Sequence, residues 1–202
     1  MNRTVGILLA GGLSRRFGSP KAFAELEGKA FYEYAYEALA AVCDHVVVIT
    51  RPELISRFPG TLDVISDSRK FAGLGPLAGI FTAMSERPAR QYLVLPCDMP
   101  FIGASETAAF MQLASEDNDI TAVRAGDHDI PLFSLWNVRI LDPLEKELED
   151  GQLRVMVFMA KVQTDWLDSS AVGGLDAFRN INKPDQLKGA DEHGSETNTR
   201  PI

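Results

Sequence analysis

The residues best suited to chemistry form a glycine-rich loop near the start of the chain. This first loop contains glycines, cations and a hydroxyl group, in the order Ala10, Gly11, Gly12, Ser14, Arg15, Arg16, Gly18 and Lys21. Glycine lets backbone N–H groups point toward a ligand and lets that ligand approach closely, and nearby cations favour an anion. Because the loop follows a short apolar run, it is typical of a phosphate site at the carboxyl end of a sheet. An ordinary glycine-rich surface turn is the alternative.

The spacing within this loop fits neither of two common nucleotide-binding templates. The Gly-x-Gly-x-x-Gly pattern of dinucleotide-binding proteins is absent, and no Gly-Lys-Ser/Thr ends the loop as in a P-loop. The loop therefore indicates an anion site without identifying the ligand.

Two aspartates follow other predicted strands. Asp67 follows a strand over 62–66, and Asp98 follows an apolar strand over 92–96. A carboxylate at the end of a central strand suits Mg²⁺, which commonly takes one or two carboxylates plus substrate phosphates. A cap on the following helix is the alternative role for Asp98.

A second glycine-rich segment, residues 67–79, leads into a helix. Pro76 suits the first helical position. Gly79, four residues after Gly75, leaves a bare strip near the start of this helix. That strip either accommodates a ligand or only allows the helix to pack closely on the sheet.

The elements that position these residues alternate between strand and helix. Apolar runs predict strands over 5–9, 45–50, 62–66, 92–96 and 119–124, with another opening at 128–133. Apolar residues at helical spacing predict helices over 31–42, from 76, over 104–115 and over 137–149, the last kinked or restarted at Asp142-Pro143. Residues 153–160 fit either a helix or a strand.

Such alternation predicts an α/β fold, a three-layer α/β/α sandwich with a mostly parallel central sheet. In a parallel sheet the strand ends that carry the first loop, Asp67 and Asp98 converge on one edge. Residues 1–188 are expected to form one domain, and the polar segment 189–202 a disordered tail.

Composition narrows the class of protein. The 202 residues are 46% hydrophobic, enough for a full core, and no apolar run approaches the ~20 residues of a membrane span. No signal peptide is recognisable, and two cysteines, Cys43 and Cys97, are too few for a disulfide scaffold or a zinc site. We therefore expect a cytoplasmic protein. The net charge of −8 argues against a general nucleic-acid binder.

Five segments in order carry a resemblance to a known family. Leu9 to Lys21 resembles the signature Leu-x-Gly-Gly-x-Ser-x-Arg-Met-Gly-x-x-Lys of nucleotidyltransferases with the Rossmann-like nucleotide-diphospho-sugar transferase fold. The other four are 75–79, 97–100, 154–158 and 178–184. Together, from about residue 5 to residue 188, they resemble the molybdenum cofactor guanylyltransferases. Phe17 departs from the usual Met, and Ser19-Pro20 stands where the family often has an Asp before the lysine. Neither departure removes a charge that the chemistry needs.

The resemblance implies that GMP is transferred from GTP to the phosphate of molybdenum-molybdopterin, with release of pyrophosphate. Fixed cations would lower the barrier, because negative charge grows on the α-phosphoryl oxygens and the leaving group. The resemblance also implies Mg²⁺ as the cofactor, with Asp98 as its ligand. A related nucleotidyltransferase that uses CTP or another phosphorylated acceptor is the alternative. A catalytically silent nucleotide-binding subunit is a third possibility, against which Arg16, Lys21 and Asp98 count.

The resemblance assigns site residues by position. Those implied in catalysis are Arg16, Lys21 and Asp98. Those implied in GTP binding are Leu9, Ala10, Gly11, Gly12, Lys21, Asp67 and Asp98. Those implied on the pterin side are Gly75, Gly79, Arg154, Asn180 and Asn182. Both asparagines could instead be turn residues that bond to their own backbone, and Cys97 is expected to pack in the core.

The implied partners are GTP and molybdenum-molybdopterin, with a GTP-binding accessory protein and recipient molybdoenzymes as further candidates. We expect a monomer or weak oligomer that binds neither nucleic acid nor membrane.

Overall fold

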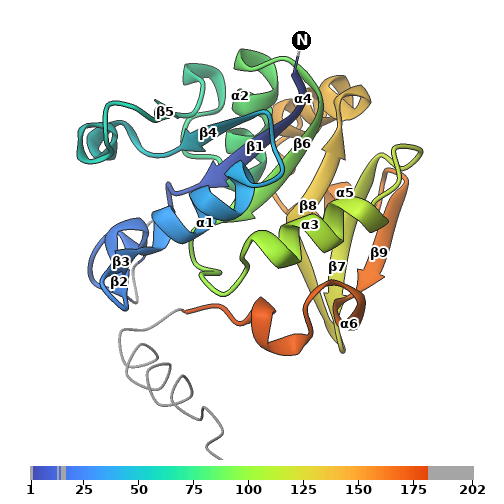
Figure 1. Ribbon diagram of the computed structural model, residues 1–202. Coiled ribbons are helices and arrows are strands. Elements are labelled where there is room, and N and C mark those ends of the chain that lie inside the picture. The colour runs from blue at the N-terminus through green and yellow to red at the C-terminus, as the bar shows by residue number, and fades with distance from the viewer. Residues whose placement is uncertain (1, 13, 15–16, 182–202) are drawn as a thin grey trace, which may run out of the picture.

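The computed structural model describes residues 2–12, 14 and 17–181. Its core is a seven-stranded sheet between two layers of helices (Figure 1). The sheet strands are β1 Asn2–Leu9, β4 His45–Ile49, β5 Asp63–Ile65, β6 Ala89–Pro96, β7 Ile120–Ala125, β8 His128–Asn137 and β9 Thr164–Asp168. A separate hairpin consists of β2 Glu25–Leu26 and β3 Lys29–Ala30.

The helices are interspersed with these strands along the chain. They are α1 Phe31–Ala40, α2 Pro76–Glu86, α3 Ala104–Leu113, α4 Leu141–Glu149, α5 Val155–Met159 and α6 Ser169–Val172. Short 3-10 turns are η1 Lys21–Phe23, η2 Pro52–Arg57, η3 Arg69–Phe71, η4 Val138–Ile140 and η5 Leu175–Phe178. None of the helices in the described ranges is long and apolar enough to cross a bilayer.

The strand order is β5-β4-β1-β6-β8-β7-β9. β1 runs parallel to β4 and β6, β4 runs parallel to β5, and β7 runs parallel to β9. β8 is antiparallel to both of its neighbours, β6 and β7. It is therefore the one reversed strand among the seven, and the prediction of a mostly parallel sheet is confirmed.

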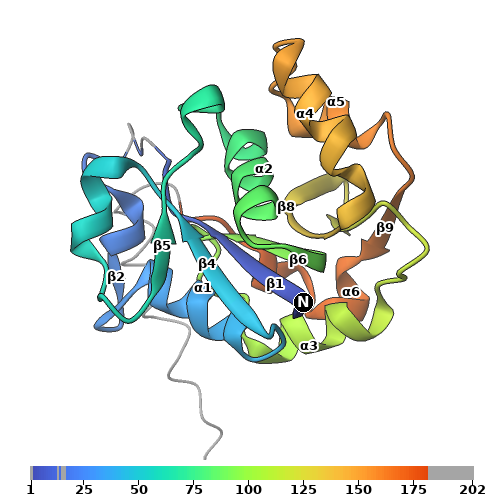
Figure 2. The same ribbon diagram turned by 90° about the horizontal axis from the view of Figure 1, so that it is seen from above.

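Two apolar cores lie on opposite faces of the sheet. Successive residues of a strand point to opposite faces, so Leu8 contributes to the core under α1 and α3, whereas Ile7 contributes to the core under α2 and α4. Figure 2 shows α1, α3 and α6 on one side of the sheet and α2, α4 and α5 on the other. Both residues are fully buried, which explains why the central strand is apolar without alternation.

Local sequence accounts for two features that the apolar pattern left open. Residues 153–160 contain a helix, α5. The predicted helix over 137–149 is restarted rather than kinked, because η4 ends at Ile140 and α4 begins at Leu141. Pro143 lies in the first turn of α4, where a missing N–H breaks no helical hydrogen bond. The predicted tail 189–202 lies outside the described residues.

Candidate functional site

The carboxyl ends of the central strands are joined by backbone hydrogen bonds at one edge of the sheet. Ala10 N donates to Ile49 O over 2.8 Å, and Cys97 N donates to Leu9 O over 3.1 Å. The hydroxyl of Thr50, which is 2% exposed, donates to Ala10 O over 3.2 Å. The predicted convergence of strand ends is therefore present, and the start of the first loop is fixed against β4 and β6.

Ser14 organises the described part of the first loop. Its backbone lies in the left-handed region with φ 47°, and its carbonyl accepts hydrogen bonds from Phe17 N and Gly18 N. Its hydroxyl donates to Gly12 O over 3.3 Å and accepts from Lys21 N over 3.1 Å. One side chain thus joins the glycines to the lysine. Arg16 lies outside the described residues.

Lys21 and Asp98 meet at the centre of the site, although they are far apart in the sequence. Lys21 Nζ lies 3.0 Å from Asp98 Oδ2, and their side chains are 12% and 27% exposed. The helix after Asp98 begins at Ala104, and Gly103 N is bonded by the Glu106 carboxylate at 2.8 Å. Asp98 does not cap that helix, so the capping alternative for Asp98 is wrong.

The segment before residue 182 reaches the same point through the backbone. Ile181 N donates to Asp98 O over 3.1 Å, and the guanidinium of Arg179 lies 4.9 Å from the centre of the Phe101 ring. Asn180, which is exposed, therefore precedes the residue that bonds to Asp98, two positions past the end of β6. No apolar periodicity in the sequence pointed to this contact. Asn182 lies outside the described residues.

Asp67 occupies a half-buried position beside the second glycine-rich segment. Its Oδ2 accepts a hydrogen bond from Gly73 N at 3.2 Å. Burial raises the pKa of the Asp67 carboxyl above its usual range, and the Gly73 N–H only partly opposes this rise. A carboxyl with a raised pKa at the edge where strand ends meet is a feature of ligand sites.

Gly79 is explained by packing. A Cβ atom at this position would lie 3.0 Å from Ile49 Cγ2, 3.2 Å from Leu9 Cδ2 and 3.5 Å from Asp67 Oδ1. The missing side chain lets α2 approach β1 and β4, which favours the packing alternative over a pterin contact. Gly75 differs, because it is exposed with φ +87° and precedes Pro76 at the start of α2.

The other predicted pterin residue, Arg154, is exposed and precedes the first residue of α5. Its backbone N donates to Gln152 Oε1 over 3.2 Å. This position is in the layer of α2 and α4, whereas Asn180 is adjacent to Asp98. The structure therefore does not bring Arg154 and Asn180 together, and a pterin contact stays a prediction for each of them.

Metal binding at this site would depend on the substrate. In the described part of the chain, no three His, Cys, Asp or Glu side chains are grouped to hold a metal ion. Asp98 offers one partly buried carboxylate, which fits Mg²⁺ when phosphate oxygens and water complete its shell. The neighbouring Cys97 is 7% exposed, and burial raises the pKa of its thiol to about 12. It is a neutral core residue at pH 7.

Asp67→Asn should raise the melting temperature of the ligand-free protein at pH 7. The folded-state pKa of Asp67 is raised, so its ionisation destabilises the fold as pH rises from the unfolded pKa through the folded one. The amide avoids this cost, and the advantage over wild type should vanish at pH values below both pKa values. Thermal melts across this range test the prediction, with the exposed Asp127→Asn as a control. A variant that melts below wild type at pH 7 would contradict it.

Comparison with known proteins identifies relatives over nearly the whole chain. Residues 6–164 match the family model of the MobA-like NTP transferase domain. A probable molybdenum cofactor guanylyltransferase from Geobacillus sp. is 36% identical over 196 residues, covering 93% of this chain and 97% of the relative. A protein of the same name from Bacillus subtilis is 36% identical over 191 residues, covering 93% and 94%.

Solved structures share the fold. Molybdopterin-guanine dinucleotide biosynthesis protein A from Archaeoglobus fulgidus superposes with a TM-score of 0.77 at 26% identity, over 96% of this chain and 100% of that one. A nucleotidyl transferase from Methanothermobacter thermautotroptrophicus superposes with a TM-score of 0.69 at 15% identity, over 96% and 98%. The second likeness supports the fold alone.

Proposed function

The chain belongs to the MobA-like NTP transferase family and is a nucleotidyltransferase, and on this basis we propose that it transfers GMP from GTP to the phosphate of molybdenum-molybdopterin. The products are pyrophosphate and the guanine dinucleotide form of the molybdenum cofactor. The contact of Lys21 with Asp98, 3.0 Å between Nζ and Oδ2, carries this proposal. It brings the first loop and the end of β6 to one point.

The proposed reaction needs no covalent nucleophile from the protein. An oxygen of the acceptor phosphate attacks the α-phosphorus of GTP, and the bond between that phosphorus and the bridging oxygen to the β-phosphate breaks. Pyrophosphate leaves with the electron pair. A phosphate monoester already carries one to two negative charges near pH 7, so the acceptor oxygen needs no general base. The neutral Cys97 thiol is consistent with this.

The chain would lower the barrier by positioning and by charge. Lys21 supplies a compact ammonium group to the phosphates, and Ser14 fixes the backbone of that lysine through its hydroxyl. The N–H groups of Gly11 and Gly12 would approach the nucleotide from the end of β1. We assign Arg16 a second phosphate contact on the resemblance alone. Donors held in place before the reaction stabilise developing charge without reorganising during it.

Asp98 would hold Mg²⁺, which when bound neutralises phosphate charge. Lys21 already contacts the Asp98 carboxylate, so the nucleotide and the metal ion together would have to draw the two side chains apart. Asp67 and the backbone at residues 9–11 would hold the ribose and guanine. Gly75, Arg154 and Asn180 would face the pterin.

The proposal also covers the cellular location, the oligomeric state and the protein partners of the enzyme. We place it in the cytoplasm as a monomer or weak oligomer. A GTP-binding accessory protein and the recipient molybdoenzymes are proposed partners.

Direct assay tests the proposal. The protein, GTP and Mg²⁺ are incubated with purified molybdenum-molybdopterin, and both pyrophosphate and the guanine dinucleotide product are quantified. The expected result is one pyrophosphate per dinucleotide. Product from CTP rather than GTP would favour the cytidylyltransferase alternative, and binding of GTP without any product would favour a silent nucleotide-binding subunit.

GTP with Mg²⁺ should raise the melting temperature far more than ATP or CTP does. A ligand that binds only the folded state stabilises it by RT ln(1 + [L]/Kd), about 2.7 kcal/mol at one hundred times Kd. Melting curves with the four nucleoside triphosphates at equal concentration measure this. Equal protection by all four would mean that the triphosphate alone is recognised.

Asn180→Asp should weaken binding of molybdenum-molybdopterin at least fivefold while leaving GTP binding nearly unchanged. A neutral amide both donates and accepts, whereas an ionised carboxylate only accepts and repels the pterin phosphate. Paired titrations with GTP and with purified cofactor measure the two effects. Asp176→Asn, a charge change at an exposed position of η5, is the control. If GTP binding falls and pterin binding holds, Asn180 belongs to the nucleotide side.

A further inference from the structure

A cavity lies at the amino end of the sheet. Its volume is about 290 Å³, room for roughly ten water-sized groups at about 30 Å³ each. Thr4 near the start of β1 and Gln91 near the start of β6 line it, and these two residues are register partners in the sheet. Figure 1 marks the N-terminus at this end of β1, whereas Lys21 and Asp98 follow the other ends of the strands. The cavity is therefore separate from the site described above.

The base of this amino-end cavity contains a polar group without a partner. Gln91 is 6% exposed, and its side-chain amide makes no hydrogen bond to any of the described residues. The Gln91 amide atoms are not among the fully buried unpaired atoms of the described residues, so the amide faces the open cavity rather than packed protein. A donor or acceptor that enters the cavity would satisfy this amide.

The walls and the rim of the cavity differ in character. Val42, Met111 and Leu135 supply apolar walls. The rim has two carboxylates, Asp44 and Glu116, but one cation, Arg3, which is paired with Glu116 at 2.8 Å.

Asp44 stays ionised at the rim. Its Oδ2 accepts hydrogen bonds from Thr4 N at 3.0 Å and Arg3 N at 2.8 Å, and these donors, Thr4 N first, lower the pKa of its carboxyl. The rim therefore has an excess of negative charge above apolar walls.

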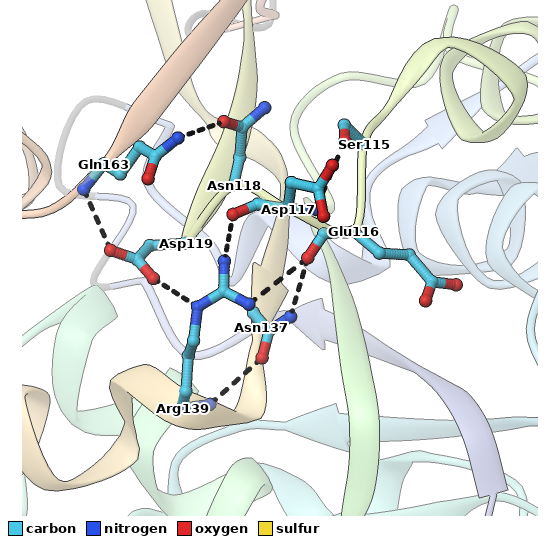
Figure 3. A network of polar contacts seen from close by, with 8 residues as sticks. All are labelled: Ser115, Glu116, Asp117, Asn118, Asp119, Asn137, Arg139 and Gln163. Carbon is cyan, nitrogen blue, oxygen red and sulfur yellow. Dashed lines mark hydrogen bonds and ion pairs between the residues drawn. The ribbon is translucent and has the colours of Figure 1, made fainter.

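A polar network holds the wall that carries Glu116. Arg139 donates to Glu116 O, Asp117 O and the Asp119 carboxylate, and Asn137 donates to Glu116 O over 3.3 Å. Figure 3 shows the Arg139 guanidinium facing these groups, while the Glu116 carboxylate points away from them. The segment between α3 and β7 is thus fixed without using the Glu116 side chain.

We propose that this cavity binds a small monocation with N–H donors on a short apolar stem, an alkylammonium or an alkylguanidinium. The charged end donates one N–H to the carbonyl oxygen of the Gln91 amide, Asp44 and Glu116 supply the compensating negative charge, and the stem lies against Val42 and Met111. Negative charge at the rim excludes anions, and the unpaired amide selects against purely apolar molecules. The cation is either a free small amine or a lysine or arginine side chain of another protein.

The test uses the full chain and follows the side-chain amide signals of glutamine by NMR. The probes are n-butylammonium and n-butylguanidinium, with n-butanol and butyrate as neutral and anionic analogues. We expect saturable shifts of the Gln91 amide with the two cations, at least tenfold weaker binding of both analogues, and at least tenfold weaker cation binding in Gln91→Leu. Gln112→Leu, an exposed glutamine of α3 outside the cavity, is the matched control.

A second variant keeps the test decisive if Gln91→Leu does not fold. Glu116→Gln removes a 59% exposed rim charge, and it should weaken both cations at least threefold, whereas the exposed Glu86→Gln should not. A blocked Gly-Lys-Gly peptide separates the two sources, because tighter binding than n-butylammonium indicates a protein side chain and weaker binding indicates a free amine. Absence of saturable shifts, equal shifts with n-butanol, or cation binding that survives both substitutions would overturn the proposal.

Discussion

Asp98→Ala is expected to lower GMP transfer by at least about 10³-fold in a protein that remains folded. The Asp98 carboxylate lies 3.0 Å from Lys21 Nζ, and because the described residues contain no group of three potential metal ligands, the proposed Mg²⁺ depends strongly on this carboxylate. The fold should survive because Asp98 does not cap α3, and its backbone carbonyl keeps the hydrogen bond from Ile181 N. Product formation and thermal melting are measured on the same preparation.

The matched control for this substitution is Asp129→Ala. Asp129 is also an ion-paired aspartate, 2.7 Å from Arg124 Nε, and its side chain is 28% exposed against 27% for Asp98. It belongs to β8, outside the proposed site, so its loss should leave turnover nearly unchanged. Near-normal turnover in folded Asp98→Ala would remove Asp98 from the proposed chemistry.

Lys21→Met should lower turnover by about 10²–10³-fold and remove most of the heat protection given by GTP. Methionine keeps an unbranched stem, so the change removes charge with little loss of packing. Lys29→Met is the control, because Lys29 is also ion-paired, with Glu37, but belongs to the β2–β3 hairpin. Unchanged protection by GTP in Lys21→Met would place the triphosphate elsewhere.

The double variant Lys21→Met/Asp98→Asn separates binding from stability. Lys21→Met alone removes the described ion-pair partner of the partly buried Asp98 carboxylate, whereas the double change removes both charges of this pair. Its melting temperature should therefore exceed the value expected from adding the two single effects, while activity stays lost. Additive melting effects would mean that the ion pair contributes nothing measurable to the fold.

The sequence was sufficient to predict the sheet edge at which Lys21 and Asp98 meet. Apolar runs that end abruptly in glycine or aspartate predict parallel strands, and the chemistry then falls at their carboxyl ends. The match is close in β4, where burial on both faces leaves one interpretation, whereas β1 begins at Asn2, before the predicted start at residue 5. Lys21 and Asp98 are distant in the chain, so the contact of Lys21 Nζ with Asp98 Oδ2 depends on the order in which the strands are arranged in the sheet.

Other features depend on partners that a local pattern does not contain. β9 has the sequence Thr-Asp-Trp-Leu-Asp, is half-buried and pairs only with β7, so its apolar signal is weak. The insertion of the reversed β8 between β6 and β7 is set by packing across the whole sheet. The β2–β3 hairpin is too short for any periodicity. β9 and the β2–β3 hairpin were therefore not predicted, and β8 was predicted as a strand without its place in the sheet.

In the site, too, some contacts could be predicted from local sequence and others depend on distant partners. Thr50 and Ser14 fix the first loop through hydrogen bonds that residue type alone does not specify. The bond from Ile181 N to Asp98 O joins two segments through backbone atoms, which carry no sequence signal. For Gly79, the sequence left ligand contact and close packing open, and only the distances to Ile49 and Leu9 favour packing.

The position of β1 between β4 and β6 also determines how the chain can fold during synthesis. Leu8 pairs with Val48 on one side, but its partner on the other side is Leu95. An emerging chain must therefore leave one edge of this central strand open until β6 has been made. Such non-local pairing slows folding and leaves an edge available to other chains. Aggregation of nascent protein should consequently depend on how fast residues 50–96 are translated.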